Sequence, residues 1–243
     1  DNIFNSTTEK VVVMIDMTKL DKILKRVEKP ARYIGMEKNS IKKDLNSVKV
    51  KFAFAFPDVY DVGMSHLGLH ILYNLLNSEE DTACERVFAP WVDMEEEMLK
   101  ENIPLFTLEN KVPIKEFDFV GFTLQYEMSY TNVINMLHLG DIPILSKDRK
   151  ETDPLVIAGG PCVYNPEPIA DIFDFFVIGE SEEVLLEILN LYKEQKGKGY
   201  SKIKFLKEIA KIEGIYVPQF YEVHYKEDNT IDRMVPIVEG VPK

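Results

Sequence analysis

The sequence predicts an α/β fold built on a doubly wound, mostly parallel sheet of five strands, because apolar strand-like runs alternate with amphipathic helices. The 243 residues are 45% hydrophobic and 29% charged, a composition that can bury a core and is not that of a disordered chain. Cys84 and Cys162 are the only cysteines. Two cysteines exclude a disulfide scaffold, a four-cysteine zinc site and a self-contained iron–sulfur cluster.

Five apolar runs have the length and composition of buried strands. They span residues 48–56, 82–87, 117–124, 154–158 and 173–178. Helices are predicted from Ser65, with Ser65 as N-cap, over 93–102, over 129–139, and after Ser181, again as N-cap. This alternation indicates a flavodoxin-like (Rossmann-like) sheet, in which ligands bind beyond the carboxyl ends of the strands.

Shifts in charge and composition divide the chain into three parts. We predict an N-terminal extension with a basic helical arm over residues 1–47, the sheet domain over 48–196, and a linker with a helix and a β-hairpin over 197–243. The hairpin strands are expected over 216–225 and 233–238, around the turn Asp228-Asn229. This last part is either an appendage or the start of a following domain. Met14 and Met17 follow residues 1–13 closely, so these residues are either native or an upstream extension. They are left out of the fold prediction.

Charge is uneven along the chain, with a net +5 over residues 1–51 and −17 over 52–243. The basic arm, from Lys19 to Lys51, can dock on the acidic globule, on another domain or on RNA, or be a solvated helix and linker. No stacking aromatics accompany it, which disfavours RNA. The total net charge of −12 argues against nucleic-acid binding by the sheet domain. No run reaches the ~18 apolar residues of a membrane span, and we expect a cytoplasmic protein.

The loop after the first predicted strand, residues 57–68, is the longest of the loops that gather at the carboxyl edge. Most strand–helix loops have about 2–6 residues, so its length favours a ligand loop over a plain connection. The helix start behind it offers free N–H groups to an anionic or carbonyl ligand. Its candidate binding residues are Asp58, Tyr60, Gly63, Met64, Ser65 and His66. His66 alone is a poor metal site, and a position next to the helix cap would explain it equally.

The loop after the third strand contains Thr123, Leu124, Gln125 and Tyr126. Thr123 offers a hydroxyl and Tyr126 a flat face to a ligand, while the alternative is a helix-entry turn with Tyr126 packed on the core. A phosphorylation receiver is excluded, since Leu124 and Gln125 stand where its aspartate would end the third strand.

The loops after the fourth and fifth strands complete the set of candidates. Gly159, Gly160 and Pro161 form a turn in which two glycines let a bulky group approach the backbone, the alternative being a tight packing turn. Cys162 lacks an evident basic partner and is expected to be a small buried side chain. Gly179 and Glu180 precede two further acids, which would repel a phosphate, so this loop suits neutral amides or hydroxyls.

Five segments in order carry a resemblance to a known family: FPDVYDVGMSHLG, ERVFAPW, DFVGFTLQYEMSYTN, PLVIAGGPCVYNPEP and DFFVIGESEEVL. Over roughly residues 29–195 the chain resembles the amino-terminal, cobalamin-binding-type domain of radical S-adenosylmethionine (SAM) proteins, and one bacterial subfamily in particular. Such domains carry Asp-x-His-x-x-Gly, Ser-x-Leu and Gly-Gly after the first, third and fourth strands. Tyr60 stands here in place of the cobalt-binding histidine, Thr123-Leu124-Gln125 lies near the second motif, and Gly159-Gly160 matches the third.

The resemblance implies that cobalamin is held without a histidine below the cobalt and with its nucleotide tail along Gly159-Gly160. Tyrosine is a poor cobalt ligand at neutral pH, because its hydroxyl titrates near pH 10. The resemblance also implies a [4Fe–4S] cluster, held by a Cys-x-x-x-Cys-x-x-Cys motif, and cleavage of SAM to a radical in a downstream domain of the same polypeptide. The chain has neither the number nor the spacing of those cysteines.

This chain alone is therefore not expected to catalyse the radical reaction. The expected role is to hold cobalamin for a radical or methyl-transfer reaction, on an unknown substrate, that the downstream domain performs. The alternative is a cofactor-free domain that docks the radical SAM barrel or a partner protein.

Overall fold

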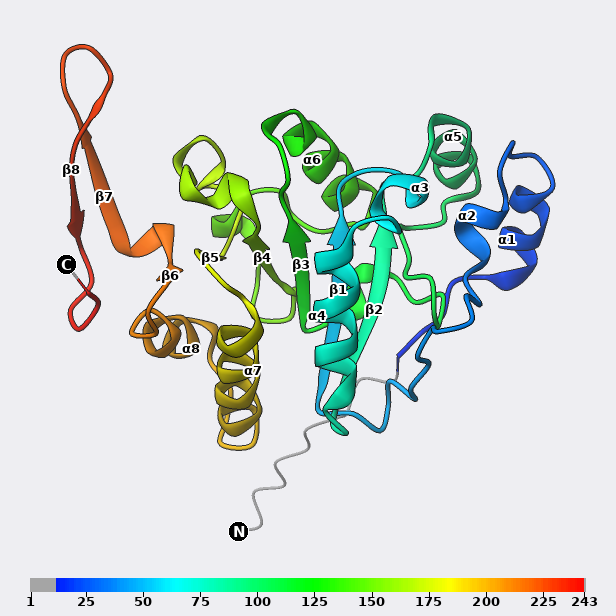
Figure 1. Cartoon of the computed structure of the whole chain (residues 1–243), viewed down its shortest axis with the longest axis horizontal. Coiled ribbons are helices and arrows are strands. Elements are labelled where there is room, and N and C mark those ends of the chain that lie inside the picture. Colours follow the sequence, from blue (N-terminus) through cyan, green and yellow to red (C-terminus); the bar gives the residue numbers. More distant parts are fainter. Residues whose placement is uncertain (1–11, 243) are drawn as a thin grey trace, which may run out of the picture.

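The computed structural model describes residues 12–242, and its centre is a six-stranded sheet with helices on both faces (Figure 1). The strand order is β2-β1-β3-β4-β5-β6, in which β1 to β5 are parallel and β6 is antiparallel to β5. The strands are β1 (Val50–Phe56), β2 (Thr82–Phe88), β3 (Phe119–Thr123), β4 (Leu155–Gly159), β5 (Phe175–Val177) and β6 (Ile215–Tyr216). The predicted doubly wound, mostly parallel α/β fold is confirmed, in the flavodoxin strand order.

The sheet has one strand more than the five predicted. The run predicted as one strand over residues 216–225 is divided into β6 and β7 (Tyr221–Tyr225) by a 3₁₀ turn at Pro218–Phe220. Proline has no N–H to donate to a ladder, so the strand ends there. β7 pairs with β8 (Ile231–Pro236) in the predicted hairpin, which stands apart from the main sheet (Figure 1).

Helices cover the two faces of the sheet in two groups. One apolar cluster joins the sheet to α1 (Met17–Leu24), α5 (Val92–Glu101) and α6 (Tyr130–Leu139). The other joins it to α4 (Leu67–Ser78), α7 (Glu182–Lys196) and α8 (Lys202–Ile209). Two single turns, α2 (Ala31–Ile34) and α3 (Tyr60–Gly63), lie near the β2 side. Both sheet faces are thus buried, which explains the nearly continuous apolar strands.

The start of α4 differs from its predicted start by one residue. His66, not Ser65, is the N-cap, and its Nδ1 accepts the Leu69 N–H at 3.2 Å while its ring lies 5.4 Å from that of Phe56. The Ser65 hydroxyl instead donates to the Val62 carbonyl at 2.7 Å. The extra turn α3 supplies that carbonyl and takes the serine out of the capping position. Ser181 does occupy the N-cap of α7, although its side chain makes no capping bond.

The outer edge of β2 is closed by groups from three other segments. Lys43 Nζ donates to the Thr82 carbonyl at 2.7 Å, and the Asn77 amide pairs with both backbone groups of Cys84 at 2.9 and 3.0 Å. Farther along, the Arg86 N–H donates to the Glu109 carboxylate at 2.8 Å, and the Arg86 carbonyl accepts the Leu108 N–H, also at 2.8 Å. An edge strand left open would pair with other chains, so these contacts protect the sheet.

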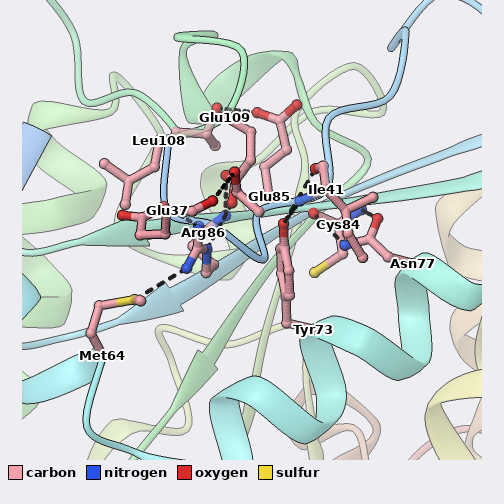
Figure 2. Close-up of polar contacts among 12 residues, drawn as sticks. Glu37, Ile41, Met64, Tyr73, Asn77, Cys84, Glu85, Arg86, Leu108 and Glu109 are labelled. Atoms are coloured by element: carbon pink, nitrogen blue, oxygen red, sulfur yellow. Dashed lines mark hydrogen bonds and ion pairs between the residues drawn. The ribbon is translucent and has the colours of Figure 1, made fainter. Parts of the chain in front are cut away.

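A buried ion cluster around Arg86 fastens the N-terminal arm to the sheet (Figure 2). The Arg86 guanidinium contacts Glu109 through Nε and Glu37 through Nη2, both at 2.7 Å, and lies 4.8 Å from the centre of the Tyr73 ring. Burial raises the pKa of Glu109 to about 7, against the opposing attraction of Arg86. Lys19 also donates to the carbonyl of Glu101 at 2.8 Å. The basic arm therefore docks on the acidic globule of its own chain, one of the destinations predicted for it.

Removing the cation of this cluster should be costly. We expect Arg86→Met to lower the free energy of unfolding by about 3–5 kcal/mol, because Glu109 is then buried without its partner. The double variant Arg86→Met/Glu109→Met should regain part of that loss, and urea unfolding measures both. Lys211→Met, in an exposed pair with Glu208, is the control and should cost less than about 1 kcal/mol. Equal losses for the single and double variants would contradict the buried pair.

Candidate functional site

The carboxyl ends of β1 to β5 lie side by side at one edge of the sheet, at the top of Figure 1. Parallel pairing with the order β2-β1-β3-β4-β5 requires this, because each strand delivers its following loop to the same edge. The loops are residues 57–66, 89–91, 124–129, 160–165 and 178–181. These loops, together with the last residues of β3 and β4, Thr123 and Gly159, contain the site residues predicted from the sequence.

Two predicted residues of the first loop turn toward the Arg86 cluster. The Tyr60 hydroxyl donates to Glu37 at 2.8 Å. The Met64 sulfur accepts a hydrogen bond from Arg86 Nη1 at 3.2 Å (Figure 2). Burial, with the adjacent Glu37 carboxylate, raises the pKa of Tyr60 to about 12. The tyrosine hydroxyl is therefore protonated and occupied on the β2 side of the sheet. Neither residue reaches toward β4.

The other predicted residues of that loop make local contacts. Gly63 is buried, and a Cβ there would lie 2.2 Å from the Phe88 ring, so only glycine fits. Ser65 and His66 hold the turn and the cap described above. Asp58 alone connects to another loop, because its Oδ2 accepts a hydrogen bond from the Tyr126 hydroxyl at 3.0 Å. That bond spans the β1–β3 boundary, where the strand order reverses.

The loops after β3 and β4 are fastened to each other through their backbones. The Leu124 N–H donates to the Gly159 carbonyl at 2.8 Å, and the Leu124 carbonyl accepts the Cys162 N–H at 3.2 Å. Gly160 has φ 98°, and a Cβ there would lie 2.7 Å from the Leu124 oxygen. The close approach of these loops explains Gly160 as a packing turn. Gly159 differs, since a Cβ there would make only ordinary contacts, with the Ser181 hydroxyl at 3.6 Å and the Val177 carbonyl at 3.8 Å.

A small, partly open cavity with a volume of about 40 Å³ lies beside Gly159, on the α4 and α7 face of the sheet. It brings together three predicted residues, Thr123, Gly159 and Gly160. Its walls are mostly apolar, with Phe52, Phe54, Leu72, Ile157, Val177 and Leu185 among them. The Thr123 hydroxyl at its rim accepts a hydrogen bond from the Gln125 amide at 2.7 Å. The cavity thus combines an apolar interior with a small polar rim, as sites for flat organic groups do.

Ser181 also lines this cavity, and the sequence reasoning treated it only as a helix cap. Its position one residue beyond Gly179-Glu180, at the first turn after β5, was the available signal. Gly179 and Glu180 are themselves exposed and do not line the cavity, and Pro161 is exposed at the start of a 3₁₀ turn. Leu124 is fully buried, so only its backbone takes part in this region.

Large apolar side chains are exposed in the loops and first helical turns that follow four neighbouring strands. We call this the carboxyl-edge surface; its members are Val62, Leu67, Trp91, Val92, Tyr126, Met128 and Tyr164. Met128 is 84% and Tyr164 73% exposed. Trp91 is held in place by the arm, since its backbone N–H donates to the Tyr33 hydroxyl at 3.0 Å and the Arg32 guanidinium lies 5.5 Å from the centre of its ring. These side chains lie along one edge because the four strands that precede their loops are neighbours in the sheet.

The described residues offer no cluster of three or more His, Cys, Asp or Glu side chains that could hold a metal ion. Cys84 and Cys162 are buried, and burial raises the pKa of both thiols. Over residues 12–242, none of the helices combines the length and the apolar character needed to cross a membrane.

Residues 68–218 match the family described as radical SAM proteins, N-terminal. The chain belongs to this family. Over 155 residues it is 34% identical to the uncharacterised protein MJ0966 of Methanocaldococcus jannaschii, an alignment that covers 62% of this chain and 28% of that protein. The chain thus spans less than a third of the length of that relative. No solved structure matches the chain at a significant level.

Radical SAM chemistry uses SAM and an iron–sulfur cluster, whose cysteine ligands this chain does not contain. The residues present fit cobalamin, which the resemblance implies, only in part. Two candidate ligand atoms of the first loop are engaged elsewhere, since the Tyr60 hydroxyl is bonded to Glu37 and His66 Nδ1 caps α4. The cavity at Gly159, at about 40 Å³, is far smaller than ligand sites, which span about 300–1,000 Å³, so it would have to open to admit even the nucleotide base of the tail.

The two adjacent glycines should respond differently to the same substitution. Gly160→Ala places a side chain at positive φ and against the Leu124 carbonyl, and we expect a loss of about 1–3 kcal/mol in the free energy of unfolding. Gly159→Ala has room and an extended backbone, and should change that free energy by less than about 1 kcal/mol. Thermal and urea unfolding of the pair measure the difference. Equal effects would show that the loops do not approach each other as described.

Proposed function

We propose that this chain is a docking domain whose carboxyl-edge surface binds the catalytic radical SAM domain of the same polypeptide. The observation that carries the proposal is the row of exposed apolar side chains at the ends of four adjacent strands. Single exposed apolar residues are common, but a group of seven at one edge is typical of an interaction site. Aromatic residues and methionine, here Trp91, Tyr126, Tyr164 and Met128, are the types enriched in such interfaces.

Charge at the same edge specifies the chemistry of the partner. The loop and helix-start residues 57–66, 89–93, 124–130, 160–165 and 178–183 contain no lysine or arginine. They contain seven carboxylates: Asp58, Asp61, Asp93, Glu127, Glu180, Glu182 and Glu183. Asp61 is paired with Arg32 of the arm, while Glu127, Glu180, Glu182 and Glu183 are exposed. The complementary surface is therefore apolar with lysine or arginine around it, which excludes nucleic acid as the partner.

The length of the relative supports a partner in the same polypeptide. The matched segment is 28% of that protein, so most of its chain lies outside the part that corresponds to this domain. A covalently linked domain meets the carboxyl-edge surface at an effective concentration in the millimolar range, so modest affinity suffices for docking. Docking there would close the open side of the catalytic domain and exclude water from its radical chemistry.

Acidic substitutions in the carboxyl-edge surface should loosen this docking in the full-length polypeptide. In Met128→Glu/Tyr164→Glu we expect amide hydrogen exchange of residues 126–128 and 162–165 to quicken by at least about tenfold, because two exposed apolar contacts become carboxylates that repel an acidic rim. High salt should weaken the charged part of the contact in the wild type as well. Hydrogen-exchange mass spectrometry measures both effects.

Ile203→Glu in α8 provides the matched control, since Ile203 is 45% exposed and lies away from the edge. It should leave exchange at the edge unchanged. The exchange rates of the same protein unfolded in denaturant provide the reference for unprotected amides. The proposal fails if the edge segments of the wild-type, full-length protein already exchange as fast as that reference.

Cobalamin binding is the second candidate, and the position of the cavity beside Gly159-Gly160 favours it. If the cavity opens between α4 and α7, Thr123, Gly159, Gly160 and Ser181 would hold the nucleotide base of the tail, which the resemblance places along Gly159-Gly160. The exposed carboxylates and backbone of the edge would accept hydrogen bonds from the amides of the corrin ring. Bound cobalamin would supply methyl-transfer or radical chemistry to the downstream domain, without a protein ligand from Tyr60 to its metal.

A cavity-filling variant separates the two candidates. If cobalamin binds, the full-length protein incubated with hydroxocobalamin keeps its visible absorbance after desalting, and Gly159→Leu, which fills the cavity, weakens retention by at least about tenfold. Gly197→Leu, at the end of α7 with ordinary contact distances, is the control and should retain the colour. A colourless wild type leaves the cofactor-free docking domain as the function.

A further inference from the structure

The hairpin β7–β8 has one apolar face and one polar face. Residues directly opposite each other in an antiparallel pair point to the same side of the sheet. The pairs on one side are Tyr221 with Pro236, Val223 with Met234, and Tyr225 with Ile231. The pairs on the other side are Glu222 with Val235 and His224 with Arg233. Three successive apolar pairs therefore form one face, which we call the hairpin face.

The outer half of the hairpin face is open to solvent. Tyr225 is 55%, Ile231 43% and Met234 41% exposed, whereas Tyr221 at the base lies 5.5 Å from Tyr216 of β6. The hairpin projects from the end of the molecule beyond β6, with no helix over it in Figure 1. Among the described strands, β7 and β8 pair only with each other and form a separate two-stranded sheet. A two-stranded hairpin is marginally stable alone, and an apolar face normally packs on another layer.

From these observations we infer that the hairpin face is the packing surface for the polypeptide segment that follows residue 243, as the first structural layer of the next domain. Two findings specify this occupant. The matched family is described as the N-terminal part of radical SAM proteins, so further polypeptide belongs to the same kind of protein. The aligned segment makes up only 28% of the relative, so most of that protein lies outside it.

Tethering also favours the following segment over a second copy of this chain. A segment of the same polypeptide is present at an effective concentration that reaches about the millimolar range, whereas a second copy must associate from dilute solution. The inference rests on the proposed function only in taking the following segment to belong to the catalytic domain. The hairpin face and the carboxyl-edge surface are separate surfaces, and each can be tested without the other.

The test compares the two faces of the hairpin within the full-length polypeptide. Tyr225→Ser/Met234→Ser removes apolar contacts, and we expect the amides of residues 222–225 and 231–235 to exchange at least about tenfold faster than in the wild type. His224→Ser/Arg233→Ser changes the opposite face of the same strands and should leave their exchange within about twofold of the wild type. Exchange at residues 126–128 and 162–165 is followed in the same experiment and should not change in either variant.

Three outcomes would overturn the inference. One is rapid exchange of the hairpin amides in the wild-type, full-length protein. Another is equal acceleration by the variants of the two faces, which would mean that the substitutions only weaken the hairpin itself. The third is protection that increases with protein concentration together with a dimer in gel filtration, which would assign the hairpin face to a second copy. Because the edge segments are read separately, failure of the hairpin inference leaves the docking proposal intact, and the reverse holds.

Discussion

Parallel pairing of β1 to β5 is the constraint on which the rest of the structure depends. It places every strand end at one edge and requires each connection to cross a face of the sheet. The crossings supply the two covering layers, and the strand ends supply the carboxyl-edge surface. Distant positions such as Leu67 and Tyr164 become members of one surface only because their strands share a direction and lie two positions apart in the sheet.

Two kinds of feature occupy this edge and differ in their physical demands. The contact between the loops after β3 and β4 is a backbone approach that tolerates no side chain at Gly160. The carboxyl-edge surface around it is exposed, so packing within the fold places few constraints on its side chains. The Gly-Gly pair is thus divided in role, with Gly160 serving the fold and Gly159 lining a cavity. A motif that suggests ligand binding can therefore be required by packing alone at one of its positions.

Features that follow from periodicity could be predicted, and features that depend on distant contacts could not. The apolar runs around Phe54, Phe122 and Ile157 gave strands close to those observed, because buried parallel strands need little context. The cap at His66 was missed, since the single turn α3 that displaces Ser65 has no apolar period. β6 was missed because two residues form no pattern and Pro218 interrupts the run.

The candidate site shows the same division. Placing Thr123, Gly159 and Gly160 together followed from topology, and the cavity contains all three. Where Tyr60 points depends on Glu37, which lies in the arm and outside any strand pattern, so its engagement on the β2 side could not be foreseen. From the sequence, Ser181 could be predicted only as the N-cap of α7. The exposed apolar side chains of the edge were individually unremarkable in sequence and became a surface only through strand order.

The closed edge of β2 determines how much polypeptide is needed for an autonomous fold. Lys43, which covers the Thr82 carbonyl, and β1, which lies between β2 and β3, both precede residue 68, where the family match begins. A fragment cut to residues 68–218 would lose the central strand and part of the cover together. Its β2 and β3 would each present a bare row of amide and carbonyl groups, and such a fragment would aggregate rather than fold as a monomer. The folding unit is therefore larger than the segment by which the family is recognised.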